Sequence, residues 1–152
     1  MLPFKRITHK QLGELLIEKG MITRGQLEKA LQFQKEKGGL IGQILVALGF
    51  TKEEEIAQAL TVQYGLPYLP IENYELSPNI VRLIPENVSR QYSLIAVDKI
   101  GDTLTVAMSN PLNTKAIEDL ELLTKSNVQV FVSTMTGVIS AINRFYGKDK
   151  ER

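Results

Sequence analysis

Apolar positions in the first 66 residues recur at intervals of three and four, which is the period of an amphipathic helix. The pattern occurs twice, over residues 11–34 and again over residues 40–63, in register and without a gap. Six aligned pairs are identical: Gly13/Gly42, Leu16/Leu45, Gly20/Gly49, Ala30/Ala59, Leu31/Leu60 and Gln34/Gln63. An internal repeat marks one structural unit that occurs in two copies. Residues 1–66 are therefore predicted to form a sub-domain of two repeated helix pairs.

Capping residues divide each copy into two helices. Gly20 and Gly49 suit the left-handed residue that ends the first helix of each pair. A threonine followed three residues later by Gln or Glu has the spacing of a capping box, and the candidates are Thr8 with Gln11, Thr23 with Gln26, and Thr51 with Glu54. Helices this short are not stable alone in water, so packing between them must hold the unit together.

The pattern changes after residue 66. Residues 94–99 and 103–108 predict a hairpin and residues 128–132 a third strand, while Pro70 limits the extended segment 68–71 to a sheet edge. Helices are expected from residue 78, over 86–92, from Asn113 onward with Ile117, Leu120 and Leu123 facing inward, and over about 137–146. This order predicts an α+β fold, in which residues 67–147 form a small, mostly antiparallel three-stranded sheet packed with helices. Residues 148–152 are expected to be a charged tail or linker.

Composition limits the classes of function that the chain is expected to have. The 18 basic and 17 acidic residues leave a net charge of +1, which does not favour a nucleic-acid partner. Cysteine is absent, His9 is the one histidine, and no glycine-rich phosphate loop occurs, so neither an enzyme nor a metal or cofactor is expected. No apolar run approaches the roughly 20 residues that span a bilayer. We therefore expect a cytoplasmic protein with no direct membrane insertion.

The repeat resembles the paired signature of the MshEN-type N-terminal domain of type II secretion and type IV pilus assembly ATPases. One copy matches the signature with Leu12-Gly13, Leu16-Ile17, Gly20, Leu27, Leu31 and Gln34, and the other with Ile41-Gly42, Leu45-Val46, Gly49, Ile56, Leu60 and Gln63. Later segments resemble the rest of that domain: Gly65-Leu66-Pro67-Tyr68, Leu83-Ile84-Pro85, Ser109-Asn110-Pro111 and Arg144-Phe145-Tyr146. The resemblance covers nearly the whole chain.

The resemblance implies a non-catalytic domain, with an ATPase core to follow after Arg152. In one role such a domain docks the ATPase to inner-membrane platform or cytoplasmic-domain proteins of the machine, and so lies peripheral to the membrane. In the alternative role it is a sensor that binds cyclic di-GMP, with one motif for each half of the ligand. The ligand-binding candidates that the alternative implies are Gln11, Leu12, Gly13, Gln34, Ile41, Gly42, Gln43, Gln63 and Asn110.

Departures from the signature favour the docking role. The resemblance implies an arginine at the first motif position of members that bind the ligand. This chain has Gln11 and Leu40 at those two positions. Asn110 and Gln43 stand where such members offer carboxylates. Charge-assisted hydrogen bonds are each worth about 1.5–3 kcal/mol, so their loss weakens a ligand site strongly. Packing explains the repeated glycines as well as ligand contact does, and the glutamines can bond to backbone within the repeat.

Overall fold

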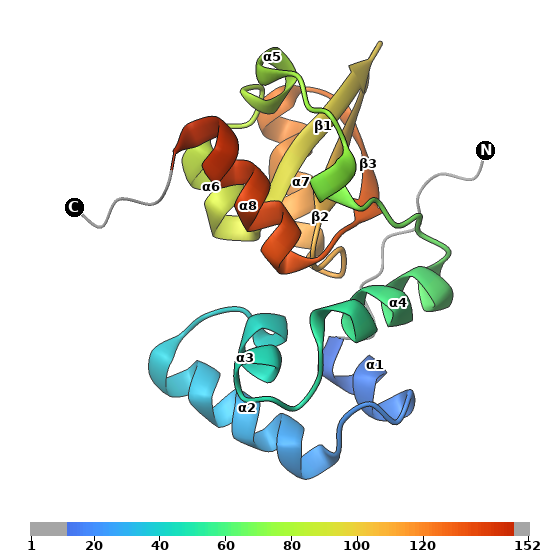
Figure 1. Ribbon diagram of the computed structural model, residues 1–152, viewed down its shortest axis with the longest axis vertical. Coiled ribbons are helices and arrows are strands. Elements are labelled where there is room, and N and C mark those ends of the chain that lie inside the picture. The colour runs from blue at the N-terminus through green and yellow to red at the C-terminus, as the bar shows by residue number, and fades with distance from the viewer. Residues whose placement is uncertain (1–11, 148–152) are drawn as a thin grey trace.

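The computed structural model describes residues 12–147 and places four helices in the first half of the chain. They are α1 (Leu12–Glu18), α2 (Arg24–Lys37), α3 (Ile41–Ala47) and α4 (Glu53–Tyr64). Gly20 and Gly49 have φ angles of 75° and 80°, as the predicted left-handed helix ends require. The predicted cap formed by Thr8 and Gln11 and the predicted tail 148–152 lie outside the described residues. Two helix pairs therefore follow the repeat, as predicted (Figure 1).

One of the two described caps differs from its prediction. At α2, Thr23 Oγ1 accepts from Gln26 N at 3.1 Å and Gln26 Oε1 accepts from Thr23 N at 2.9 Å, so this capping box is confirmed. At α4 the helix begins one residue later than expected. Glu55 Oε1, and not Glu54, accepts both the Lys52 amide at 3.2 Å and the Thr51 hydroxyl at 3.0 Å. The N-cap is therefore Lys52 and not Thr51, because the carboxylate that accepts from the cap amide belongs to Glu55, three residues after Lys52.

The helices bury one apolar core. Its fully buried members include Leu15, Leu16, Leu45 and Leu60, each 0% exposed. Leu31 was expected in the inward stripe of its helix but is 44% exposed. The two repeats therefore share a pattern without sharing the same surroundings.

The second half begins with the 3₁₀ turn η1 (Ile71–Asn73) and the short helices α5 (Pro78–Val81) and α6 (Glu86–Tyr92). The strands are β1 (Leu94–Ile100), β2 (Thr103–Met108) and β3 (Asn127–Val132), and the last two helices are α7 (Thr114–Thr124) and α8 (Met135–Tyr146). The strand order is β1-β2-β3. The predicted α+β fold and its elements are confirmed.

The sheet is mixed, so the expectation of a mostly antiparallel sheet is wrong for one of its two ladders. β1 pairs with β2 antiparallel through a tight hairpin, whereas β2 pairs with β3 in parallel. Parallel neighbours need a crossover connection, and α7 supplies it. Beyond β3 the extended segment at the sheet edge is present, with Leu69 N donating to Val132 O at 2.9 Å and Val132 N to Pro67 O at 2.9 Å.

Helices cover both faces of the sheet (Figure 1). α7 packs Ala116, Ile117 and Leu120 onto one face, while Leu123, expected in the same stripe, is 50% exposed. α8 packs onto the other face through Val138, Ala141 and Ile142. None of the helices within residues 12–147 has the length and apolar content to cross a membrane.

The two halves meet at the end of β3. Val132, the last residue of that strand, is fully buried in the helical core, and Leu112 from the loop after β2 packs against the same core. This contact places the starts of α4 and α8 on either side of a crevice between the halves.

Candidate functional site

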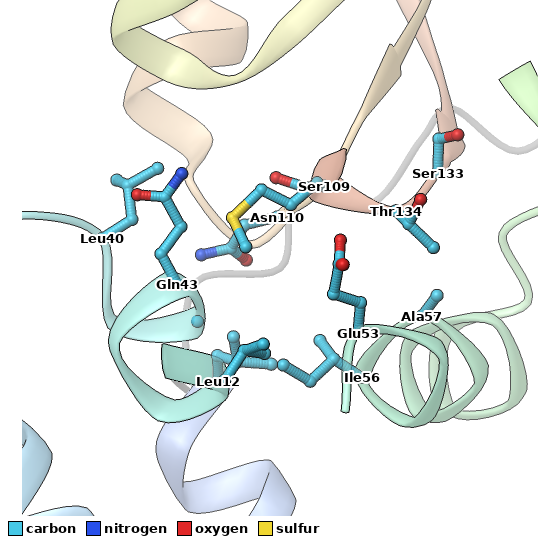
Figure 2. A pocket seen from close by; sticks show the side chains of 13 residues that line it. Leu12, Leu40, Gln43, Glu53, Ile56, Ala57, Ser109, Asn110, Ser133 and Thr134 are labelled. Atoms are coloured by element: carbon cyan, nitrogen blue, oxygen red, sulfur yellow. The ribbon is translucent and has the colours of Figure 1, made fainter. Parts of the chain in front are cut away.

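A crevice lies between the helical half and the sheet half (Figure 2). From the helical half it is lined by Leu12, Leu40, Gly42, Gln43, Val46, Glu53, Ile56 and Ala57, and from the sheet half by Ser109, Asn110, Ser133, Thr134 and Met135. The cavity is about 30 Å³. That volume holds about one or two water molecules, and small-molecule pockets are typically about 300–1,000 Å³. A ligand the size of a nucleotide would fit there only if the two walls moved apart.

Glu53 joins the two halves across this crevice. Its carboxylate accepts the Thr136 amide at 2.6 Å through Oε1 and the Thr136 hydroxyl at 2.6 Å through Oε2. Thr136 lies in the first turn of α8, where backbone amides have no partner within the helix and favour an anion. In Figure 2 the Glu53 side chain points from α4 toward the sheet half. There Thr134 caps α8, because its hydroxyl oxygen accepts from Gly137 N at 3.1 Å. Glu53 therefore acts as a second cap for α8, supplied by the other half.

One charged side chain, that of Glu53, is found among the described lining residues of the crevice. Burial raises the pKa of nearby Tyr68, and the carboxylates of Glu72, Glu54 and Glu53 raise it further. The Glu53 carboxylate is already bound by the amide end of α8, and no described lysine or arginine lines the wall to attract an anion.

A second crevice occupies the matching place in the first repeat. It is lined by Gly13, Glu14, Leu27, Leu31, Gln34 and Ile41. Gly13, Glu14 and Leu27 are the repeat equivalents of Gly42, Gln43 and Ile56, which line the first crevice. Each crevice also takes one apolar side chain from the other repeat, since Ile41 lines the second and its equivalent Leu12 lines the first. The helical half thus presents two related crevices, of which the sheet half covers one.

Close packing constrains one of the two repeated glycines more than the other. A Cβ atom at Gly13 would lie 2.5 Å from Leu27 Cδ1, and one at Gly42 would lie 3.3 Å from Leu12 Cδ2. Real Cβ atoms do not approach carbon atoms as closely as the first of these distances. A side chain at position 13 would therefore require Leu27 to move, whereas one at position 42 would require only a small adjustment of Leu12.

The other candidate residues are dispersed. Leu12, Gly42, Gln43 and Asn110 line the crevice between the halves, whereas Gly13, Gln34 and Ile41 line the second crevice. Gln63 is exposed on the last turn of α4 and lines neither. Gln11 lies outside the described residues. The structure brings the candidates together as two groups, one for each repeat, and their role in ligand binding stays a prediction.

Two of these polar side chains are engaged within the chain. Gln34 Nε2 donates to Gly39 O at 2.9 Å, which ties the end of α2 to the turn before α3. Asn110 Oδ1 accepts from Leu112 N at 3.1 Å and so holds the turn after β2. Both contacts are structural, as the alternative explanation from the sequence allowed.

Sequence reasoning missed Glu53 and Met135 as lining residues. The three adjacent glutamates of α4 have different roles: Glu53 accepts from Thr136, Glu55 caps its own helix, and Glu54 is exposed. The spacing of Thr134 and Gly137 is typical of a helix N-cap, and the start of a helix attracts an anion. No pattern in the sequence indicates which carboxylate lies beside this helix start.

Residues 64–152 match the family described as the MshEN domain. Over 138 residues the chain is 34% identical to the type IV pilus assembly ATPase PilB of Myxococcus xanthus, a match that covers 91% of this chain. The chain spans 24% of the length of that relative. What matches is a domain and not an ATPase core, so the chain is a non-catalytic domain, as predicted.

Two solved structures share the fold. A structure of MshE with cdg (cyclic di-GMP) is 31% identical, with a TM-score of 0.69, and the match covers 91% of this chain and 100% of that one. The N-terminal domain of XpsE is 22% identical, with a TM-score of 0.73 and coverage of 90% and 94%. At that identity the second likeness shows the fold alone.

Proposed function

Because the chain belongs to the MshEN domain family, we propose that it is a docking and regulatory domain that couples a type II secretion or type IV pilus assembly ATPase to inner-membrane partner proteins. The family resemblance predicted from the repeat is confirmed. The observation that carries the docking role is the crevice between the halves, which is about 30 Å³ in volume and is bridged by a carboxylate.

Electrostatics support docking over nucleotide binding. Cyclic di-GMP brings two phosphate charges, and Glu53 is the one charged side chain among the described residues of the crevice wall. Leu40 stands at the motif position where ligand-binding members are expected to have arginine, so neither a cation nor a guanine partner is offered there. Entry of a dinucleotide would also separate Glu53 from Thr136. The Glu53 charge, the missing arginine and the loss of the contact with Thr136 each disfavour the binding of cyclic di-GMP.

In this proposal the helical sub-domain and the α+β sub-domain act together, and one of them engages the partner. An ATPase core in the same polypeptide is part of the proposal. The protein is then cytoplasmic and reaches the inner membrane through its partners, without inserting into the bilayer or binding nucleic acid.

Co-sedimentation tests the docking role. The chain is mixed with lipid vesicles that contain the inner-membrane platform protein of the same machine, and separately with vesicles of the same lipid alone. We expect the chain to sediment with the first and to stay in solution with the second. Equal sedimentation with both would assign membrane contact to lipid, and no sedimentation with either would refute docking to this protein.

A cyclic di-GMP sensor is the second candidate, and the structure of MshE with cdg at 31% identity favours it. Binding would require the halves to open, with Gly42 and Gln43 on one wall and Asn110 on the other. A thermal melt with and without the dinucleotide tests this candidate. A rise in melting temperature that the Gln43→Ala variant loses would establish the sensor, and an unchanged melting temperature would exclude it.

A further inference from the structure

An apolar groove lies open on the sheet half, between α6 and α7. Its walls are formed by six residues: Val88, Gln91, Tyr92, Asp119, Leu122 and Leu123. Leu122 is 79% exposed and Leu123 is 50% exposed. Single exposed apolar residues are common on protein surfaces, whereas apolar side chains that gather along one groove indicate a place where another molecule binds. None of the six residues lines either crevice of the candidate site.

The groove is held in shape by contacts within the chain. The Tyr92 hydroxyl donates to Asp119 Oδ2 at 2.7 Å and so ties α6 to α7. Val88 and Tyr92 also pack against the core beneath α7. A groove that is already formed loses little conformational entropy when a partner binds to it.

The groove carries negative charge. Asp119 is the one charged side chain among its described lining residues, and the exposed Glu118 lies one turn before Leu122 on the same face of α7. Lys115 pairs with Asp119 at 3.5 Å, but the two side chains are 76% and 38% exposed, so the pair is weak. The hydrogen bond to Asp119 raises the pKa of Tyr92, whose neutral hydroxyl leaves the carboxylate charge in place. A partner is therefore expected to present an apolar side chain beside positive charge.

The outer face of α2 has this chemistry. Phe33 is 40% exposed, and the exposed Lys29 and Lys37 lie four residues before and after it, which places all three in one row along the helix. The opposite face, with Leu27 and Ala30, is the buried one. Basic residues outnumber acidic ones along the whole helix, with Arg24, Lys29, Lys35 and Lys37 against Glu28 and Glu36.

One chain does not bring these two surfaces together. α2 lies at the end of the helical half that is remote from the sheet, whereas α6 and α7 pack on the sheet itself (Figure 1). Contact between α2 and the groove must therefore join two copies. The contact uses a different surface on each copy, so further copies can add to it until a ring closes or a chain of copies forms.

We propose that the groove between α6 and α7 binds α2 of a second copy of this chain, with Phe33 seated against Leu122 and Leu123. The lysines on either side of Phe33 then lie beside the acidic side of the groove. Aromatic residues are enriched in the buried centres of protein interfaces, and Phe33 fills that place here. The inference goes beyond the proposed function, because it concerns how copies of the domain assemble and does not depend on an inner-membrane partner.

Analytical ultracentrifugation of four single variants tests the two surfaces. Phe33→Glu alters α2 and Leu122→Lys alters the groove, and each leaves the other surface intact. Val62→Glu and Ile100→Lys are matched controls, because Val62 is 70% exposed on α4 and Ile100 is 73% exposed at the end of β1. All four side chains are exposed, so each variant should fold, and circular dichroism melts check that it does.

We expect the wild-type chain to associate as its concentration rises toward about 1 mM. Phe33→Glu and Leu122→Lys should each weaken this association by about tenfold or more, with both controls within about twofold of the wild type. Higher salt should also weaken it, because the charges involved are exposed. A wild type that stays monomeric, association that either groove or α2 variant retains, or association that salt does not change would overturn the proposal.

An equimolar mixture of Phe33→Glu with Leu122→Lys tests the pairing itself. The first variant keeps its groove and the second keeps its α2, so one junction can form while both ends of the pair are altered. We expect dimers and nothing larger. Monomers alone, or assemblies larger than a dimer, would overturn the pairing of α2 with the groove.

The platform protein is the other occupant that the same variants would reveal. In that case the wild-type chain stays monomeric, and Leu122→Lys weakens binding of the platform protein's cytoplasmic domain while Ile100→Lys does not. That result would overturn the proposal and assign the groove to the docking function.

Discussion

Gly13 and Gly42 occupy the same position in the two repeats and are each the second residue of a helix, yet their nearest neighbours lie at different distances. Substitution by alanine gives the same gain in helix propensity at both sites, so the difference between the variants reports packing. A Cβ at Gly13 would approach Leu27 to 2.5 Å, while one at Gly42 would approach Leu12 to 3.3 Å. We expect Gly13→Ala to be less stable than Gly42→Ala by about 1–2 kcal/mol in urea denaturation. Equal stabilities would contradict the packing role of Gly13.

The contact between Glu53 and Thr136, which joins the two halves, can be tested by replacing one side chain. Two hydrogen bonds from Thr136 are lost in Glu53→Ala, and because both are exposed to solvent the free energy of unfolding should fall by only about 1–2 kcal/mol. Hydrogen exchange at the Thr136 amide should also become faster. Glu54→Ala is the control, because its neighbouring side chain is exposed and we expect no change. A similar loss in both variants would mean that helix charge, and not the contact, is responsible.

The sequence predicted single residues well where local chemistry decides them. Thr23 with Gln26 is a capping box and Gly49 is left-handed, because only neighbours within a turn are involved. The partner of Glu53 is 83 residues away in the chain, and no local pattern indicates it. Among the residues that line the crevice between the halves, the sequence indicated Gly42, Gln43 and Asn110 and did not indicate Glu53. Their role in ligand binding stays a prediction.

At the scale of elements, Tyr146 ties the end of α8 to the segment that follows α5. Its hydroxyl lies 2.8 Å from Ile84 O and 3.1 Å from Val81 O. Burial raises the pKa of Tyr146 above its ordinary value near 10. The neutral form is the one that the fold favours, so this contribution is present below pH about 10 and is lost as pH rises through the raised pKa.

We therefore expect Tyr146→Phe to lower the free energy of unfolding by about 1 kcal/mol at pH 7. Denaturation at intervals from pH 8 to above pH 10 should show wild-type stability falling toward that of the variant. A gap between the two proteins that widens with pH would contradict the assigned sign.

Element types were predictable, and one pairing was not. Alternation and turn residues indicated each of the three strands, but neither states which strands lie side by side. The direction of β3 follows from α7, whose helical crossover returns the chain to the same end of the sheet. The N-cap of α4 is Lys52 and not the predicted Thr51. The Glu55 carboxylate accepts hydrogen bonds from both the Thr51 hydroxyl and the Lys52 amide.

At the scale of the whole molecule, Val132 belongs to both halves. It ends β3 and is 0% exposed within the helical core, whereas Val130 of the same strand is 2% exposed in the core beneath α7. Val132→Ala should remove about 2 kcal/mol and lower hydrogen-exchange protection in α4 as well as in the sheet. Val130→Ala should lower protection mainly in the sheet half. Equal effects on α4 would show that the halves open only together.

How the halves meet could not be predicted from the sequence. The repeat gives each helix pair the same apolar stripe, and the identical Leu31 and Leu60 do not indicate which copy is covered. Coverage depends on contacts of Leu112 and Val132, which are far from either repeat in the chain. The docking role, which the missing arginines favour, stays a prediction.

We propose that the domain docks a protein partner and needs no nucleotide ligand to do so. Calorimetric titration of the platform protein's cytoplasmic domain into this chain, with and without excess cyclic di-GMP, distinguishes this role from that of a sensor. We expect the same dissociation constant in both titrations, and no heat when the dinucleotide alone is injected. Partner binding that appears only with cyclic di-GMP, or micromolar binding of the dinucleotide itself, would refute the proposed role.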